Sequence, residues 1–211
     1  MVKKITAADG FAGDNFGATV AMSGNKILVG ATLNDEKGLN AGAAYLFTKD
    51  QGGADNWGQL TKIMAADGQG GDMFGASLDI DTDHAVIGAN FDDDKGVNSG
   101  SAYIFNKDQG GADNWGQVKK LTANDGASSD NFGISVSLNA DFIMVGANMN
   151  DDKGANSGSA YIFERNYGGV SNSWGQAIKL LAQDGTSSDQ LGIAVSVNGN
   201  FAVAGARFDN I

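Results

Sequence analysis

The sequence lacks cysteine and proline entirely, and His84 is the single histidine among its 211 residues. Without cysteine the chain can form no disulfide and no thiolate metal site, and it offers no cysteine nucleophile. One histidine also argues against histidine metal clusters and against most Ser-His-Asp arrangements. These absences leave few routes to enzymatic chemistry.

Basic residues are scarce as well, since 14 Lys and Arg stand against 25 Asp and Glu, for a net charge of −11. Nucleic acids and anionic membrane surfaces attract basic patches, so we expect neither as a partner. No apolar stretch approaches the roughly 20 residues that span a bilayer, so we expect no membrane insertion. The first residues, Met1–Lys4, lead into polar sequence without a signal-peptide core, and a signal for export would lie outside this sequence.

Glycine is abundant, with 32 residues, and the chain repeats itself at intervals of about 58 residues. The segment Lys-Ile-Thr-Ala-Ala-Asp-Gly at 4–10 recurs in similar form at 62–68, 120–126 and 179–185. Each copy continues with Asp-x-Phe-Gly, which becomes Asp-Gln-Leu-Gly in the last copy, and later with a Gly-Ala pair. We therefore interpret residues 1–211 as a single repeat domain, with copies at 3–60, 61–118, 119–177 and, in part, 178–211.

The hydrophobic pattern predicts four short β-strands in each copy and no helix. Residues 134–138 alternate between apolar and polar, whereas residues 26–30 form an apolar run typical of a strand buried on both faces. Further strands are predicted over 101–105 and 115–121. Four antiparallel strands with Gly and Asn at the reversals are typical of a propeller blade. The predicted fold is thus all-β: a β-propeller of four-stranded antiparallel blades, with about three and a half repeats.

Several motifs together resemble a known repeat. The Phe-Gly and Gly-Ala elements resemble the FG-GAP repeat of integrin-type β-propellers. The set Lys-Leu-Thr-Ala-x-Asp-Gly, Asp-Asn-Phe-Gly, Val-Gly-Ala-Asn, Asp-Asp-Lys-Gly and Ser-Gly-Ser-Ala-Tyr-Ile-Phe more closely resembles the FG-GAP-like repeats of bacterial surface and secreted proteins. The resemblance covers essentially all 211 residues and implies an extracellular or cell-surface location. Because one fold hosts many functions, it predicts architecture more strongly than activity.

The order of the predicted strands leaves the ring incomplete. With strands labelled a to d outward, the chain begins with a strand d at Val2–Thr6, continues through three complete blades, and ends with strands a and b at 193–206. A propeller normally has at least about four blades, and the last one here lacks strand c. The chain is then part of a larger ring, one half of a two-chain ring of roughly eight blades, or an open stack. Because open strand edges invite pairing, we expect a homo-oligomer or a larger ring.

The predicted topology sorts the charges onto one face. In a four-stranded meander the b–c loops and the d–a connections lie at the same end of each blade. These two loop families hold most of the acidic residues, and the basic residues among them are Lys37, Lys95, Lys153 and Arg207. Such a face attracts cations or basic partners.

The b–c loops also alternate oxygen-bearing residues around a glycine, a pattern that suits Ca²⁺. The candidate metal ligands are Asn90, Asp92, Asp94, Gly96 and Asn98, then Asn148, Asn150, Asp152, Gly154 and Asn156, with Asn34, Glu36 and Asn40 as a weaker set. Calcium is the only cofactor that the sequence suggests. In the integrin family the calcium loop lies between strands a and b, and here that turn has shrunk, for example to Ser23-Gly24-Asn25, so the family's metal sites do not carry over. The alternative is that Asp, Asn and Gly form turns and solvate the surface.

Other recurring residues have structural interpretations. The acid before each Phe-Gly can accept backbone N–H bonds that shape the turn into strand a, and the phenylalanine itself is expected to pack between blades. The tryptophans and tyrosines could stack on sugars, but regular recurrence in strands favours packing. His84 has no counterpart in the other copies and is interpreted as incidental. The residues concerned are Asp14, Asp72, Asp130 and Asp189; Phe16, Phe74 and Phe132; Trp57, Trp115 and Trp174; and Tyr45, Tyr103 and Tyr161.

No catalytic constellation stands out. Phosphate loops and nucleophile elbows are absent, and every recurring acid appears three or four times rather than in one asymmetric pair. We expect no enzyme but a non-catalytic extracellular or cell-surface propeller module for adhesion or protein–protein contact, with calcium as a stabiliser. A carbohydrate-binding, lectin-like propeller is the first alternative, so the ligand is a protein or a glycan. A non-catalytic fragment of a larger secreted enzyme is the second.

Overall fold

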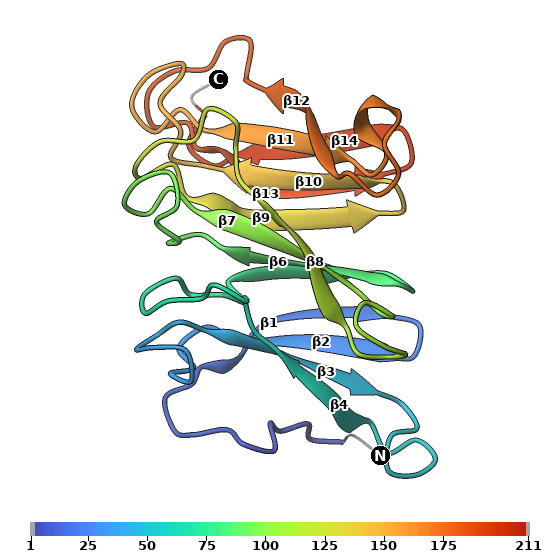
Figure 1. Ribbon diagram of the computed structural model, residues 1–211. Helices are drawn as coiled ribbons and strands as arrows, with labels where there is room; N and C mark the ends of the chain where they lie inside the picture. Colours follow the sequence, from blue (N-terminus) through green and yellow to red (C-terminus); the bar gives the residue numbers. More distant parts are fainter. Residues whose placement is uncertain (1–2, 210–211) are drawn as a thin grey trace.

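The computed structural model describes residues 3–209, which form three four-stranded antiparallel sheets and one two-stranded sheet (Figure 1). We call these sheets blades 1 to 4 in chain order. Blade 1 contains β1 (Phe16–Ser23), β2 (Lys26–Ala31), β3 (Ala43–Thr48) and β4 (Gly58–Ile63); blade 2 contains β5 (Ser77–Ile80), β6 (His84–Ala89), β7 (Ser101–Asn106) and β8 (Gly116–Leu121); blade 3 contains β9 (Phe132–Asn139), β10 (Phe142–Ala147), β11 (Ser159–Glu164) and β12 (Gly175–Leu180); and blade 4 contains β13 (Leu191–Asn198) and β14 (Phe201–Ala206). The predicted all-β fold of four-stranded blades is confirmed.

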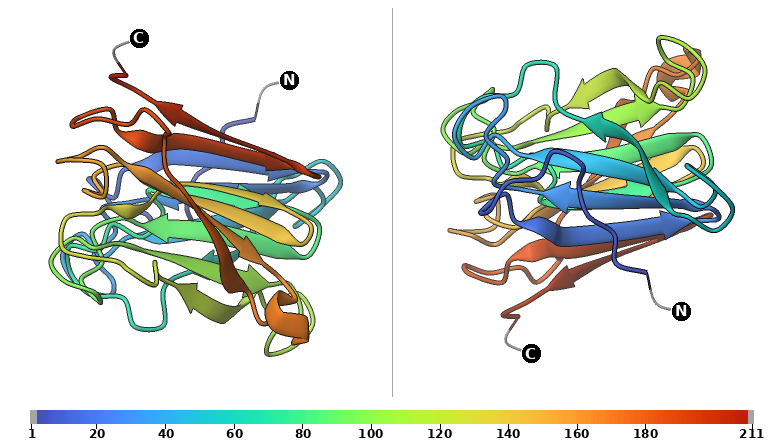
Figure 2. Two further views of the ribbon diagram at one scale, coloured as in Figure 1. Left: turned by 90° about the horizontal axis from the view of Figure 1, so that it is seen from above. Right: turned by 90° about the horizontal axis from the view of Figure 1, so that it is seen from below.

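The blades pack against one another in chain order. The first strands of neighbouring blades contact one another: β1 packs on β5, β5 on β9, and β9 on β13. Side chains of all four first strands, including Val20, Leu78, Val136 and Val195, line one shared cavity of about 370 Å³. Figure 1 shows blade 1 at one end of the assembly and blades 3 and 4 at the other, and Figure 2 gives the views from above and below. The first strand of each blade is therefore the innermost, as in a propeller.

The Phe-Gly and Gly-Ala elements meet where two blades touch. A Cβ added to Gly88 of β6 would lie 2.1 Å from the carbonyl oxygen of Gly133 in β9, so only glycine fits at this approach. Beside it, the hydroxyl of Ser77 donates a hydrogen bond of 2.7 Å to the same oxygen. The equivalent junctions place Gly30 against Gly75 and Gly146 against Gly192. The repeated glycines thus set the spacing between blades.

Aromatic side chains fill the space inside and between the blades. Phe74 and Phe132 are buried and pack edge-on against Tyr103 and Tyr161, with ring centroids 5.4 Å apart in both pairs. The predicted core role of these phenylalanines is confirmed. Trp115 and Trp174 are buried as well, and Trp115 shares one core cluster with Leu28 of blade 1. These tryptophans precede β8 and β12 at positive φ, of 51° and 45°, rather than lying within the strands.

The predicted strand at Val2–Thr6 is wrong over the described residues. Lys3–Thr6 form no strand, and Val2 lies outside the described part of the chain. A strand d needs strand c of its own blade as a hydrogen-bonding neighbour, and none lies beside this segment. Instead, Ile5 packs on the core of blade 1, and the N–H of Ala8 donates 2.9 Å to Gln59 Oε1 of β4. The segment therefore does not join the two-stranded blade 4.

Two further features complete the fold. One turn of 3-10 helix, η1 (Tyr167–Gly169), lies between β11 and β12, and no helix within residues 3–209 is long and apolar enough to cross a membrane. His84 is buried, with Nε2 3.1 Å from Asn106 Nδ2 and its ring edge-on to Trp174. Its position at the junction of blades 2 and 3 makes it a core residue.

Candidate functional site: the lysine-bridged loop face

The second-to-third-strand loops and the segments that enter each first strand lie together at one end of the blades, on the left in Figure 1. We call this surface the loop face. Contacts between the two loop families confirm the predicted topology, because Lys62 Nζ at the end of β4 joins Asp9, from the entering segment, to Glu36, from the β2–β3 loop. The acidic residues of both families therefore share one face.

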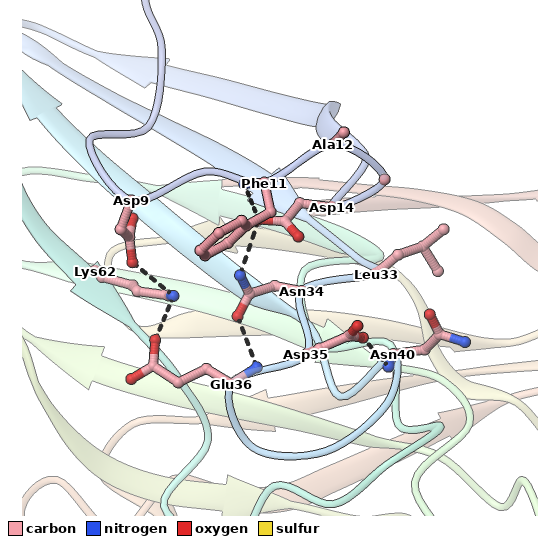
Figure 3. A pocket seen from close by; sticks show the side chains of 11 residues that line it. Asp9, Phe11, Ala12, Asp14, Leu33, Asn34, Asp35, Glu36, Asn40 and Lys62 are labelled. Carbon is pink, nitrogen blue, oxygen red and sulfur yellow. Dashed lines mark hydrogen bonds and ion pairs between the residues drawn. The ribbon is translucent and has the colours of Figure 1, made fainter.

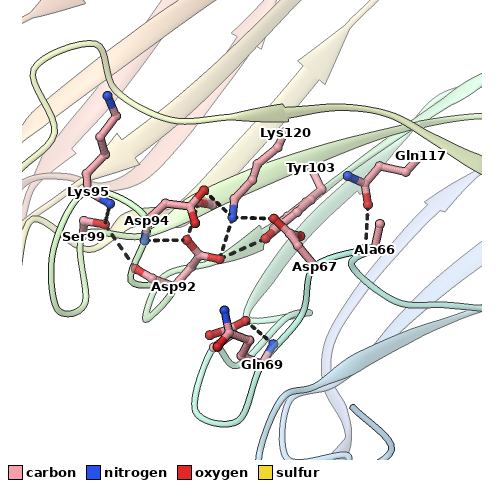
Figure 4. A network of polar contacts seen from close by, with 12 residues as sticks. Ala66, Asp67, Gln69, Asp92, Asp94, Lys95, Ser99, Tyr103, Gln117 and Lys120 are labelled. Carbon is pink, nitrogen blue, oxygen red and sulfur yellow. Dashed lines mark hydrogen bonds and ion pairs between the residues drawn. The ribbon is translucent and has the colours of Figure 1, made fainter. Parts of the chain in front are cut away.

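Blade 2 shows the arrangement most fully (Figure 4). Lys120 Nζ, carried by β8, lies 2.8 Å from Asp67, 2.9 Å from Asp92 and 2.6 Å from Asp94. The ammonium also stands 5.2 Å from the ring centroid of Tyr103, a cation–π distance. The Tyr103 hydroxyl donates 3.0 Å to Asp92 Oδ2. One lysine thus holds three carboxylates from two loops.

The same design recurs in blades 1 and 3 with one carboxylate fewer. Lys62 lies 2.9 Å from Asp9 and 2.5 Å from Glu36, and Lys179 lies 2.5 Å from Asp125 and 2.6 Å from Asp152. The basic residues predicted for this face were Lys37, Lys95, Lys153 and Arg207, and that set is incomplete because it lacks these three lysines. Their recurrence in the Lys-Ile/Leu motif was a visible signal, but their partners in the entering segments lie more than fifty residues away in the chain.

The pKa shifts of Lys120 and Asp67 favour the charged form of each group. Burial disfavours the ammonium of Lys120, but its bonds to Asp67, Asp94 and Asp92 outweigh this effect and raise its pKa above the usual 10.5. Burial likewise opposes ionisation of Asp67, yet the bond from Lys120 lowers its pKa below 3.8. Burial, together with the neighbouring charge of Asp92, raises the pKa of Tyr103, so its hydroxyl remains a donor. The clusters therefore act as electrostatic cross-links between loops.

The acid before each Phe-Gly has the predicted turn-forming role. Asp14 Oδ2 accepts a 3.0 Å bond from the N–H of Phe11 three residues earlier, and Asp72, Asp130 and Asp189 accept equivalent bonds. In blade 1 the amide of Asn34 donates 3.1 Å to the same carboxylate. Blade 2 has Asp92 where blade 1 has Asn34, and burial together with the charge of Asp92 raises the pKa of Asp72. Blade 2 therefore concentrates more buried negative charge than its neighbours.

The residues predicted to bind calcium have separate structural partners. Asp92 and Asn150 turn inward and accept hydroxyl bonds from Ser101 and Ser159, of 2.9 and 2.6 Å. Asn40, Asn98 and Asn156 take left-handed φ values of 55–57° and donate backbone bonds of 2.7 Å to Asp35, Asp93 and Asp151. Gly38, Gly96 and Gly154 also have positive φ, while Asn34, Asn90 and Asn148 are buried.

The geometry brings Asp92 and Asp94 together, but around a lysine ammonium rather than an open point. Within residues 3–209 no group of three or more Asp, Glu or His side chains is placed to hold a metal ion. Of the predicted ligand oxygens, Asn148 Oδ1 is buried without a hydrogen-bond partner in the described structure. The donor set thus does not match the six to eight converging oxygens that Ca²⁺ takes. Calcium binding stays a prediction and forms no part of the function proposed below.

A cavity of about 650 Å³ opens in the loop face of blade 1, lined by Asp9, Phe11, Asp14, Glu36 and Lys62 among others (Figure 3). In blade 2, the β2–β3 loop of blade 1 covers the equivalent place. There the N–H groups of Gly71 and Phe74 each donate 2.9 Å, to the carbonyls of Leu39 and Ala41. No preceding loop covers blade 1 among the residues that the structure describes, so its entering segment is accessible.

Residues 1–47, 57–105, 115–163 and 174–211 match the sequence profile of the FG-GAP repeat. The chain belongs to the FG-GAP repeat family. The second and third matches each begin at the fourth strand of one blade and end at the third strand of the next, so an FG-GAP repeat straddles two blades. A search of curated proteins found no match to this FG-GAP protein.

The loop face of this FG-GAP protein also exposes large apolar side chains. Phe11 is 80% exposed, Leu39 73% and Val97 63%, and all three stand among the acidic loops. Leu39 and Val97 occupy the same position in the loops of blades 1 and 2. The face therefore combines negative charge with apolar contact points, on loops that lysine bridges hold in place.

Proposed function

We propose that this FG-GAP repeat protein is a non-catalytic extracellular or cell-surface module that contacts a protein partner through its loop face. FG-GAP repeats typically form non-catalytic modules with a β-propeller-like fold. The observation that carries the proposal is the exposure of Phe11, Leu39 and Val97 within an acidic surface. Such a surface fits a partner that presents basic side chains around an apolar centre.

The rigidity of the loops supports a binding role. Each lysine cluster ties a second-to-third-strand loop to the segment entering the same blade, as Lys120 ties Asp94 to Asp67. Loops held in one conformation lose little conformational entropy when a partner binds. A protein partner would thus meet a preformed surface.

The aromatic residues favour a protein partner over a glycan. Sugar binding commonly uses exposed aromatic faces, but Tyr45, Tyr103, Tyr161, Trp115 and Trp174 are all buried. The hydroxyls of Tyr103 and Tyr161 donate to carboxylates of the lysine clusters, and Trp115 and Trp174 belong to the core. Five of the six aromatic residues that the sequence suggested as stacking platforms are therefore buried, and the sixth, Trp57, is partly buried.

Selection of phage-displayed random peptides on the immobilised protein tests the proposal. Enriched peptides should combine Lys or Arg with apolar residues, and the triple variant Phe11→Ser, Leu39→Ser, Val97→Ser should lose their binding. The matched control is Val170→Ser in the β11–β12 connection, at the opposite end of the strands, where the side chain is 62% exposed.

Two outcomes would contradict the proposal. One is peptide binding that the triple variant retains and the control loses. The other is reproducible binding to one sugar type on a glycan array, abolished by the same loop substitutions, which would establish the carbohydrate alternative.

A further inference from the structure

The two ends of the blade series carry uncovered apolar faces. On blade 1, Val20 and Met22 of β1 are 69% and 62% exposed. On blade 4, Phe201 and Val203 of β14 are 80% and 67% exposed. We call the first surface the front face and the second the back face. Among residues 3–209 no strand covers either face, and the N-terminal segment packs on blade 1 only through Ile5 and Ala7, leaving Val20 and Met22 exposed.

Each face has buried equivalents inside the protein. The residues that correspond to Met22 are Ile80, Leu138 and Val197, and they are only 5%, 8% and 7% exposed because the preceding blade covers them. The residues that correspond to Val203 are Leu28, Val86 and Met144, all fully buried against the following blade. The front and back faces are therefore the two unmatched halves of a junction that the chain forms three times.

The glycine at the back face shows the same mismatch. In the three internal junctions a Cβ on Gly30, Gly88 or Gly146 would come within 2.4 Å of the next blade's backbone. A Cβ on Gly205 would meet nothing closer than the Ala194 carbonyl oxygen at 3.8 Å. Within residues 3–209, nothing in the packing requires a glycine at this position. A glycine becomes necessary only if a further blade approaches β14.

A third contact pair matches across the same two faces. In each of two internal junctions, the first residue of the second strand lies against the tryptophan of the next blade. Lys26 Nζ is 5.9 Å from the ring centroid of Trp115, and the ring centroids of His84 and Trp174 are 5.8 Å apart. The corresponding pair at the ends is Phe201 and Trp57. Trp57 is only partly buried and borders a cavity of about 390 Å³ that Lys3, Ile5, Ile27 and Asp55 also line.

We propose that the protein associates with a second copy of itself head to tail, with the back face of one copy packed on the front face of the next. The occupant is a second copy because both halves of the junction belong to this chain and match the residues of its own internal junctions. The N-terminal segment contributes as well, since Ala8 bonds to Gln59 as Ala66 bonds to Gln117 at the next junction. Two copies joined at both ends would form a ring of roughly eight blade positions, within the usual propeller range.

The test is the mass of the full chain and its variants in solution, by native mass spectrometry and sedimentation velocity. The wild type should form species larger than the 21.6 kDa chain. Val20→Asp blocks the front face and Val203→Asp the back face, so each variant alone should stay monomeric. A mixture of the two should form a two-chain species, because each variant keeps the face that the other lacks. Val170→Asp, an equally exposed valine away from both faces, should behave as the wild type.

Gly205→Ala separates association from folding. It should leave the melting temperature of the monomer unchanged and abolish association, because the added Cβ has space in one chain and none in the junction. A wild type that stays at 21.6 kDa at every concentration would overturn the proposal. So would a Val203→Asp variant that assembles as the wild type does, or a mixture of the two blocking variants that stays monomeric.

Discussion

Replacing Lys120 with methionine should destabilise the protein far more than the same change at Lys62. Both lysines bridge two loops, but their partners differ in burial. The side chain of Asp92 beside Lys120 is 5% exposed, whereas those of Asp9 and Glu36 beside Lys62 are 45% and 53% exposed. Removing the partner of a buried charge is costly because the remaining charge cannot be hydrated.

The magnitude follows from that difference. Breaking a buried ion pair costs about 3–5 kcal/mol, and an exposed pair contributes about 0–1 kcal/mol. Asp92 keeps hydrogen bonds from Ser101, Tyr103 and the backbone of Asp94, so the loss lies at the lower end. We expect Lys120→Met to lower the free energy of unfolding by about 3 kcal/mol. Lys62→Met should lower it by about 1 kcal/mol.

Urea unfolding followed by tryptophan fluorescence measures both variants. The control is the double variant Asp92→Asn, Lys120→Met, which removes the buried charge and gives blade 2 the asparagine that blades 1 and 3 have in Asn34 and Asn150. It should recover most of the loss. Equal losses for the two lysine variants, or no recovery in the double variant, would refute the assignment of the cost to buried Asp92.

Three further predictions concern the junctions and the clusters. Gly88→Ala should lower the free energy of unfolding by about 3 kcal/mol, because the new Cβ would lie 2.1 Å from the carbonyl oxygen of Gly133. Gly205→Ala should change it by about 0.5 kcal/mol or less in chemical denaturation of the monomer. Equal effects of the two substitutions would contradict the packing argument. Ser77→Ala removes the 2.7 Å bond to that same carbonyl and should cost about 1–2 kcal/mol in the same assay, and an unchanged midpoint would show that the bond adds nothing. Because the folded-state pKa of Lys120 is raised above 10.5, the contribution of Lys120 to stability is complete below that pH and is lost as the pH rises through the folded-state pKa. The melting temperature of the wild type should therefore fall at alkaline pH, and that of Lys120→Met should fall less steeply. A wild-type melting temperature that does not change at alkaline pH would contradict this.

Local patterns predicted most of the fold. The repeated Phe-Gly and Gly-Ala elements and the apolar runs at 26–30 and 101–105 identified strands that β2 and β7 confirm, and their recurrence implied identical blades. The turn role of Asp14 was also predictable, since its partner, the N–H of Phe11, lies three residues away. Each of these features depends on residues close together in the chain, which is why the sequence reveals them.

Features that depend on distant partners were not predictable. The strand expected at Val2–Thr6 does not form over its described part, because strand formation depends on a neighbour that no local pattern reports. Lys120 meets Asp67 across 53 residues, through the packing of a β8 end against a loop of another repeat. The loop acids were therefore predictable as residues of one face, but the lysines among them were not.

The sequence by itself determined the number of repeats, the order of strands in each blade and the acidic character of one face, because these follow from periodicity and chain connectivity. Only the tertiary structure decided that lysine ammonium groups bridge the loop carboxylates, and that Met22 and Val203 remain exposed where their equivalents are buried. The physical reason is that burial and ion pairing are properties of neighbours in space. Repeats that look equivalent in sequence differ according to whether another blade covers them.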